Sequence, residues 1–165
     1  MPNTGHVGKD LRISLFNTNV LRDTKLTTYL KDSDGKVFGG CNALFVDKSG
    51  TVWTHADNGI ARFDGISWEL FDSATVSPDL HFVLYSSIIQ DKSGTVWFGT
   101  EGSGLLAYKD NRWYQFTNRD SIPCNYISSL VLDNKDNLWI LTHNGITVDN
   151  RNITLFFGDN YNYPP

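Results

Sequence analysis

The sequence has little of what disulfide bonding, cofactor binding and membrane insertion require. Only two of its 165 residues are cysteines, and it contains no paired-cysteine metal spacing, phosphate-binding loop or serine-nucleophile motif. No apolar run is long enough to cross a bilayer, and the N-terminus lacks the positive region and apolar core of a secretory signal. We therefore expect no disulfide, no cofactor, no metal ion and no membrane segment.

Positive charge is also scarce. The 14 Lys and Arg residues are outnumbered by 18 Asp and Glu, which gives a net charge of −4 without any basic cluster. Because nucleic-acid binding depends on clustered positive charge, we expect no nucleic-acid partner. The missing signal sequence indicates a cytoplasmic protein, unless the chain is a mature fragment or a piece of a longer protein.

Aromatic residues, in contrast, are abundant. They make up 13% of the chain, with 5 Trp, 7 Tyr and 10 Phe, and 40% of all residues are hydrophobic. They fall in short runs with β-branched residues, separated by turns containing Gly, Asn or Asp, which is typical of β-strands. We predict an all-β fold, with residues 1–165 forming a single domain.

One segment recurs about three times, at residues 47–71, 91–116 and 133–156. Each copy begins with an Asp-containing turn and carries one marker tryptophan: Trp53, Trp97 and Trp139. The markers are 44 and then 42 residues apart. A period of about 40–45 residues with about four strands per repeat is typical of β-propeller blades.

The central copy shows how one blade is built. The turn Asp91–Gly94 precedes a strand around Trp97, and turns at 102–104 and 109–112 bound two further strands. A fourth strand ahead of them, Tyr85–Ile89, would line the propeller axis. Since a single sheet cannot bury both of its faces, we predict that blades stack and that the marker tryptophans are wedges between them.

Residues 1–40 fit the repeat poorly. Leu11–Phe16 resembles the outer strand of a blade whose other strands lie elsewhere, and Asp32–Phe38 echoes the Asp-to-Trp segment with Phe at the marker position. We predict a hairpin over Leu26–Gly40, either a truncated blade or an elaborated inter-blade loop. The prediction is thus a partial propeller of about 3 to 3.5 blades of four antiparallel strands, with an irregular part at 1–40 and blades at 41–72, 82–117 and 125–157.

The repeat resembles that of the two-component-regulator propeller family. The match is closest at Trp97–Thr100 followed by Gly104–Leu105, and Ile122–Asn125 matches the loop that enters the next blade. The copies around Trp53 and Trp139 depart from the family pattern after the tryptophan. A similar repeat occurs in streptogramin lyases, whose lysing residues cannot be located in this sequence.

The resemblance covers residues 41–157 and implies a function. Family members are seven-bladed propellers, often in tandem, in the extracytoplasmic sensor regions of hybrid histidine kinases. The resemblance therefore implies a non-enzymatic module for signal transduction that binds a small molecule or an oligosaccharide. The module would be periplasmic if it belongs to such a receptor. No functional residue of the family transfers to a numbered position.

Three to three and a half blades cannot close a ring. An open array leaves blade faces and sheet edges unburied, and these drive association. We expect either a homodimer, in which two copies complete one ring, or a piece of a larger propeller. In the dimer, the strand Leu11–Phe16 could complete a blade of the partner.

In a propeller, the turns between second and third strands share one face with the inter-blade loops. Four residues after each marker tryptophan, these turns contain Asp57, Glu101 and His143. Such residue types can bind metals or do acid–base chemistry, although solvated loop residues are the simpler interpretation. We predict no catalytic residue and a ligand-binding face formed by these three with His55, Tyr85 and Arg119, while Tyr85 and Tyr126 either stack on a sugar or serve in packing.

Three functions stay open from the sequence. The first is the ligand-sensing module that the resemblance implies. The second is a propeller enzyme similar to the streptogramin lyases, which a metal requirement at Asp57, Glu101 and His143 would favour. The third is a structural half-propeller that self-assembles and binds no small ligand.

Overall fold

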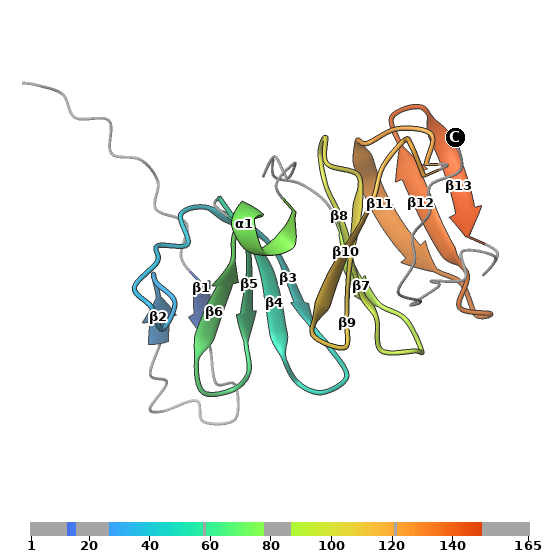
Figure 1. The fold of residues 1–165 in the computed structure, drawn as a ribbon. Helices are drawn as coiled ribbons and strands as arrows, with labels where there is room; N and C mark the ends of the chain where they lie inside the picture. Colours follow the sequence, from blue (N-terminus) through green and yellow to red (C-terminus); the bar gives the residue numbers. More distant parts are fainter. Residues whose placement is uncertain (1–12, 16–26, 58, 78–86, 121, 150–165) are drawn as a thin grey trace, which may run out of the picture.

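The computed structural model describes residues 13–15, 27–57, 59–77, 87–120 and 122–149. These residues are mostly β-structure: three antiparallel sheets stack side by side as propeller blades (Figure 1), and a separate two-stranded sheet precedes them in the chain. The arc of blades is open, so the prediction of an all-β partial propeller is confirmed.

Each blade is a meander in which every strand pairs with the next one along the chain. Blade 1 consists of β3 (Cys41–Val46), β4 (Val52–Ala56), β5 (Gly59–Phe63) and β6 (Trp68–Phe71). Blade 2 consists of β7 (Ile88–Gln90), β8 (Val96–Gly99), β9 (Leu105–Lys109) and β10 (Arg112–Phe116). Blade 3 has three described strands, β11 (Ile127–Leu132), β12 (Leu138–Thr142) and β13 (Gly145–Asp149).

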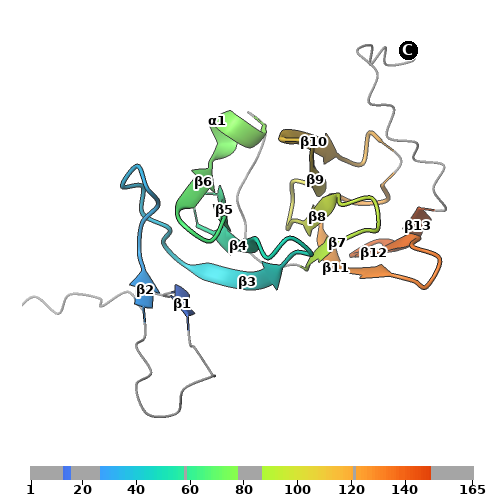
Figure 2. The same cartoon turned by 90° about the horizontal axis from the view of Figure 1, so that it is seen from below.

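The first strands of the three blades, β3, β7 and β11, lie along one side of the arc, and the outer strands β6 and β10 lie on the other side (Figure 2). The turns that join first to second and third to fourth strands therefore lie at one end of the blades. The turns that join second to third strands lie at the opposite end, which is where the sequence analysis places the binding face.

One aspartate in each repeat holds the marker tryptophan. The indole Nε1 donates to an Oδ2 atom six residues earlier: Trp53 to Asp47 at 2.9 Å, Trp97 to Asp91 at 3.0 Å and Trp139 to Asp133 at 3.1 Å. The Oδ1 atom of the same side chain accepts a main-chain N–H four residues on, from Thr51, Thr95 and Asn137. One carboxylate thus closes the turn and fixes the indole, which explains the fixed spacing from Asp to Trp.

The marker tryptophans are wedges at two of the three positions. Trp53 is 2% exposed and packs against Phe98 and Trp113 of blade 2, and Trp97 is 3% exposed in a cluster with residues of blade 3. Trp139 is 42% exposed, so the prediction that it is also a wedge is wrong within the described residues. No described blade covers its face.

Residues 30–38 form a hairpin that is built like the start of a blade. Lys31 and Val37 form an antiparallel bridge, and the Oδ1 atom of Asp32 accepts the N–H groups of Asp34 at 3.0 Å and Lys36 at 2.7 Å, as the repeat aspartates do. Phe38, at the marker position, is 2% exposed.

Phe38 and Tyr29 pack against Trp68 of blade 1, with ring centroids 5.2 and 5.7 Å from the indole. The hairpin therefore covers part of the blade 1 face that is turned away from blade 2.

One other expectation needs correction. The strand β1 (Ile13–Leu15) pairs with β2 (Thr27–Tyr29), so this part of Leu11–Phe16 is not the outer strand of another blade. The loop after β6 contains a single helical turn, α1 (Ser73–Val76), whose N-cap Asp72 accepts the N–H of Thr75 at 3.2 Å. The fourth strand expected for blade 3, at Ile153–Phe156, lies outside the described residues.

Candidate functional site

The second-to-third-strand turns place Asp57, Glu101 and His143 at the same end of the three blades, as predicted. The side chain of Asp57 forms a hydrogen bond within the fold. Its Oδ2 accepts the N–H of Gly40 at 2.6 Å, and its own N–H donates to the carbonyl of Phe38 at 3.0 Å. A Cβ added at Gly39 would lie 2.4 Å from the same Oδ2, so the carboxylate fits closely against the end of the N-terminal hairpin.

Glu101 and His143 come together around Tyr126, which precedes β11. Glu101 forms an antiparallel bridge with Tyr126, and the N–H of His143 donates to the Tyr126 carbonyl at 3.2 Å. The Tyr126 and His143 rings stack with centroids 5.3 Å apart and an interplanar angle of 15°. Tyr126 is 46% exposed, His143 is exposed and Glu101 is half-buried. We call this set, which lies between blades 2 and 3, the Tyr126 cluster.

His55 does not belong to this exposed face. It lies within β4, is 8% exposed, and its ring centroid is 6.2 Å from that of Phe98 in blade 2. Neither ring nitrogen has a hydrogen-bond partner among the described residues. Burial lowers the pKa of His55 from 6.5 to about 4, so the side chain is neutral at pH 7 and packs as an interior ring.

The other two predicted residues have no contact with the cluster that the structure describes. Arg119 is exposed in the turn after β10, where its N–H donates to the Thr117 hydroxyl at 3.2 Å. Tyr85 lies outside the described residues. The structure thus brings together two of the predicted residues, Glu101 and His143.

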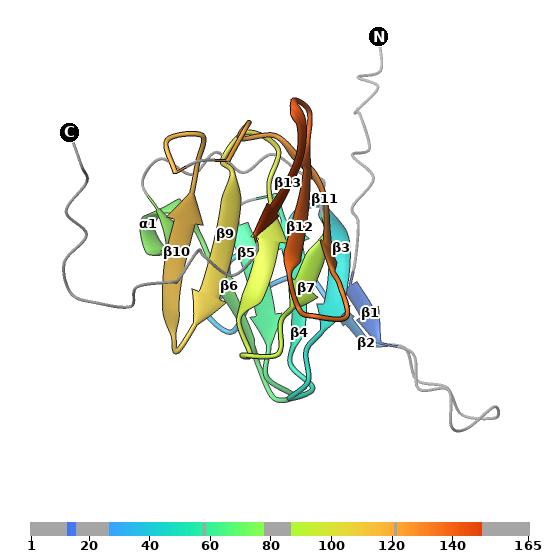
Figure 3. The same ribbon diagram turned by 90° about the vertical axis from the view of Figure 1, so that its right-hand side faces the viewer.

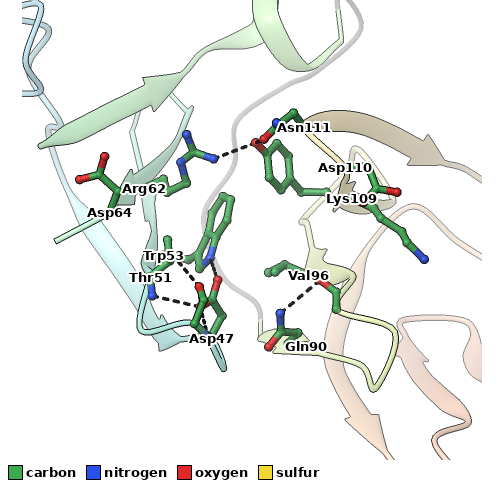
Figure 4. Close-up of a pocket in the computed structure, with 13 residues that line it drawn as sticks. Asp47, Thr51, Trp53, Arg62, Asp64, Gln90, Val96, Lys109, Asp110 and Asn111 are labelled. Carbon is green, nitrogen blue, oxygen red and sulfur yellow. Dashed lines mark hydrogen bonds between the residues drawn. The ribbon is translucent and has the colours of Figure 1, made fainter. Parts of the chain in front are cut away.

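A groove that the sequence analysis missed lies at the opposite end of blades 1 and 2 (Figure 4). Its volume is about 380 Å³, and its walls come from the first-to-second and third-to-fourth strand turns of both blades. The residues that shape it include Asp47, Trp53, Arg62, Gln90, Tyr108 and Asn111.

Arg62 is the central polar residue of this groove. Its Nη1 donates to the Tyr108 hydroxyl at 2.8 Å, and its Nη2 pairs with Glu69 at 2.7 Å. The guanidinium carbon also lies 5.8, 5.3 and 5.7 Å from the ring centroids of Trp53, Phe71 and Tyr108. Partial burial raises the pKa of Tyr108, so its hydroxyl stays protonated and donates to Asn111 at 2.9 Å.

The repeats themselves carry a signal for this arginine. Counted from the glycine that begins the third strand, Arg62 stands where blade 2 has Ala107 and blade 3 has Val148. Ala107 is fully buried, which shows that a small apolar side chain suffices for blade stacking at this position. A repeat-by-repeat comparison would have marked Arg62 as the exception.

Neither metal binding nor a membrane span has support in the described part of the chain. No three His, Cys, Asp or Glu side chains gather there in a way that could hold a metal ion. The helical turn found among these residues is too short to cross a bilayer.

Two segments of the chain, residues 80–102 and 121–144, match the family model of the two-component regulator propeller. Both segments are thus similar to two-component regulator propeller repeats. They include β7 and β8 of blade 2 and β11 and β12 of blade 3. No curated protein sequence matches the chain significantly.

Solved structures share the fold. The extracellular domain of a hybrid two-component system from B. thetaiotaomicron aligns with a TM-score of 0.64 and 19% identity, over 81% of this chain and 19% of that one. PorZ, a surface component of the type-IX secretion system of Porphyromonas gingivalis, aligns with a TM-score of 0.59 and 23% identity, over 81% of this chain and 21% of that one. Virginiamycin B lyase from Staphylococcus aureus aligns with a TM-score of 0.56 and 23% identity, over 85% of this chain and 48% of that one. The chain therefore spans a fifth to a half of these relatives, and the likeness is one of fold.

Proposed function

We propose that the chain is a segment of a non-enzymatic, ligand-sensing β-propeller of the two-component regulator type. The family repeats at 80–102 and 121–144 support this assignment, as does the fold shared with an extracellular two-component domain. The observation that carries it is the Tyr126 cluster, in which two adjacent blades contribute Glu101, Tyr126 and His143 to one exposed site.

The chemistry of the cluster suits a polyhydroxylated ligand such as an oligosaccharide. The exposed part of the Tyr126 ring, held in place by its stacking on His143, can pack against the apolar face of a sugar ring. The Glu101 carboxylate accepts hydrogen bonds from hydroxyl groups, and the imidazole can donate or accept them. A few convergent polar groups around an aromatic surface are typical of small-ligand sites.

A thermal-shift screen against a panel of oligosaccharides tests the proposal. A panel member at 100 times its Kd should stabilise the unaltered chain by about 2.7 kcal/mol and raise its Tm. Tyr126→Ala should abolish this rise, whereas Ile66→Ala, at a 91% exposed position on a distant turn, should leave it unchanged. A panel without any stabilising member, or a rise that survives Tyr126→Ala, would contradict the proposed site.

The ring and the location belong to the same proposal. We expect further blades, from a second copy or from the rest of a larger propeller, to complete the ring. As part of a sensor receptor, the protein would act in the periplasm. The structural alternative, a self-assembling half-propeller without ligand, is supported by the open face of blade 3, while the likeness to virginiamycin B lyase supports no catalytic residue.

A further inference from the structure

No described element lies over the outer face of blade 3 (Figure 3). This face carries an apolar patch. The strand register pairs Val131 with Trp139 and Leu141 with Ile146, so these four side chains share one face of the sheet. We call them the C-terminal patch; their exposed fractions are 57% for Val131, 42% for Trp139, 41% for Leu141 and 67% for Ile146.

The chain itself shows what covers such a face. At the equivalent face of blade 1, Trp53 is enclosed by Phe98, Tyr108 and Trp113 of blade 2. At the equivalent face of blade 2, Trp97 belongs to one buried cluster with residues of β11 and β12. Trp139 has the same bond to its turn aspartate as both buried tryptophans, so its face is already shaped for a blade.

The other end of the arc carries a second apolar patch. On β3, Ala43 and Phe45 pack into the core between blades 1 and 2, so the alternating Leu44 and Val46 point away from blade 2. The N-terminal hairpin covers the outer part of this face and leaves two of its own apolar side chains half-exposed. We call the four residues the N-terminal patch; their exposed fractions are 47% for Leu30, 52% for Val37, 65% for Leu44 and 57% for Val46.

The two patches are of opposite type. The C-terminal patch lies on the side of a blade that meets the following blade. In the N-terminal patch, Leu44 and Val46 lie on the side of blade 1 that meets a preceding blade, and Leu30 and Val37 lie on the hairpin that covers the rest of that side. These are the two sides that join in both inter-blade interfaces of this chain. All eight residues are apolar, so contact between the two patches would remove apolar surface from water.

We infer that two copies of this chain close one ring head to tail, with the C-terminal patch of each copy seated on the N-terminal patch of the other. A two-fold rotation about the propeller axis forms both contacts at once, and association then stops at the dimer. The inference rests on the ring completion proposed above and names its partner and its surfaces. It does not depend on the Tyr126 cluster, which each copy carries complete.

Opposite charges placed on the two patches test this arrangement. Val37→Glu alters only the N-terminal patch and Ile146→Lys only the C-terminal patch, and both side chains are more than half-exposed, so each variant should fold. Ile66→Glu, on a turn outside both patches, is the matched control. Far-UV circular dichroism confirms the fold of each variant, and light scattering on a size-exclusion column gives its mass.

The unaltered chain and Ile66→Glu should have twice the 18.6 kDa chain mass, and Val37→Glu and Ile146→Lys should each have the mass of one chain. An equimolar mixture of these two variants should recover the dimer. Every mixed pair contains one unaltered contact and one contact in which Glu faces Lys, whereas each variant alone alters both contacts.

Other results would overturn the inference. If only Ile146→Lys dissociates the protein, two blade 3 faces pack on each other; if the unaltered chain is a monomer, or the mixture stays monomeric, no head-to-tail ring forms. An oligosaccharide that still binds through Tyr126 in such a monomer would leave the sensing proposal standing. Failure of the oligosaccharide screen with an intact dimer would remove the sensing proposal alone.

Discussion

Replacing Trp97 and Trp139 by alanine, one at a time, isolates the energy of inter-blade packing. The two residues share their type, their repeat position and their hydrogen bond to a turn aspartate, at 3.0 and 3.1 Å. They differ in the exposed fraction of the residue, which is 3% for Trp97 and 42% for Trp139. The difference between the two substitutions therefore reports what a neighbouring blade contributes.

The magnitude follows from the exposed areas. A Trp side chain buries roughly 150–250 Å², so the difference in cover corresponds to roughly 60–100 Å² of surface. At about 25 cal/mol per Å² this is about 1.5–2.5 kcal/mol. Trp97→Ala should cost about 3–5 kcal/mol, because it also leaves a cavity, and Trp139→Ala should cost less by at least this difference.

Urea denaturation at a protein concentration low enough to keep the chain monomeric measures both costs. Equal costs under these conditions would refute the argument, because they would show that blade 3 leaves its outer face no more open than blade 2. At a higher concentration, where dimers form, the cost of Trp139→Ala should rise towards that of Trp97→Ala.

Three further outcomes follow from single side chains. Because the pKa of His55 is lowered from 6.5 to about 4 in the folded chain, the unfolded chain binds a proton first as the pH falls. The contribution of neutral His55 to the free energy of unfolding should therefore be fully present above pH 6.5 and should fall by about 2–3 kcal/mol towards pH 4.5. His55→Leu should remove this part of the pH dependence in urea titrations, and an unchanged slope would contradict the buried placement. Arg62→Ala should lower the free energy of unfolding by roughly 1–2 kcal/mol, because it removes the contacts of the guanidinium with the aromatic rings. Glu69→Ala removes only the ion pair of a 52% exposed side chain and should cost less than about 1 kcal/mol. The reverse order would show that the ion pair outweighs the ring contacts. Asp91→Ala should cost about 2–4 kcal/mol in the same assay, since it strands two buried donors, and a cost near zero would mean that the turn closes without the carboxylate.

The repeat period predicted the blades because it reflects a local requirement. Each turn aspartate, strand and marker tryptophan lie within a few residues of one another, so their pattern is complete in the sequence. The interpretation of Asp91 as a turn residue was correct but partial. The constant spacing of six residues to Trp97 also reflects the indole–carboxylate bond, which turn chemistry alone does not reveal.

The errors concern properties that depend on neighbouring blades. Trp139 follows its turn aspartate at the same six-residue spacing as Trp97, yet no described blade packs on its face. A polar histidine close to a turn is expected at the rim of a propeller, but His55 faces blade 2 because it alternates with Thr54 along β4. Arg62 was overlooked because its partner Tyr108 is 46 residues away and its role is visible only across the interface.

The candidate site shows the same division. The position four residues after each marker correctly placed Asp57, Glu101 and His143 at one end of the blades, since that end is set by strand order. The stacking of His143 on Tyr126 could not be predicted, because it depends on how the loop into blade 3 crosses the end of blade 2. The hydrogen bond from the Gly40 N–H to Asp57 could not be predicted either, because it depends on the hairpin that precedes the first full blade.

The measurement that tests the central claim most directly is the solution mass of the unaltered chain by light scattering across a concentration series. The central claim is that the chain is an open arc of propeller blades that needs further blades to cover its ends. It predicts a discrete dimer of twice 18.6 kDa that dissociates only on dilution. A monomer of 18.6 kDa that stays folded at high concentration would contradict the claim, because the exposed faces would then be stable without a partner.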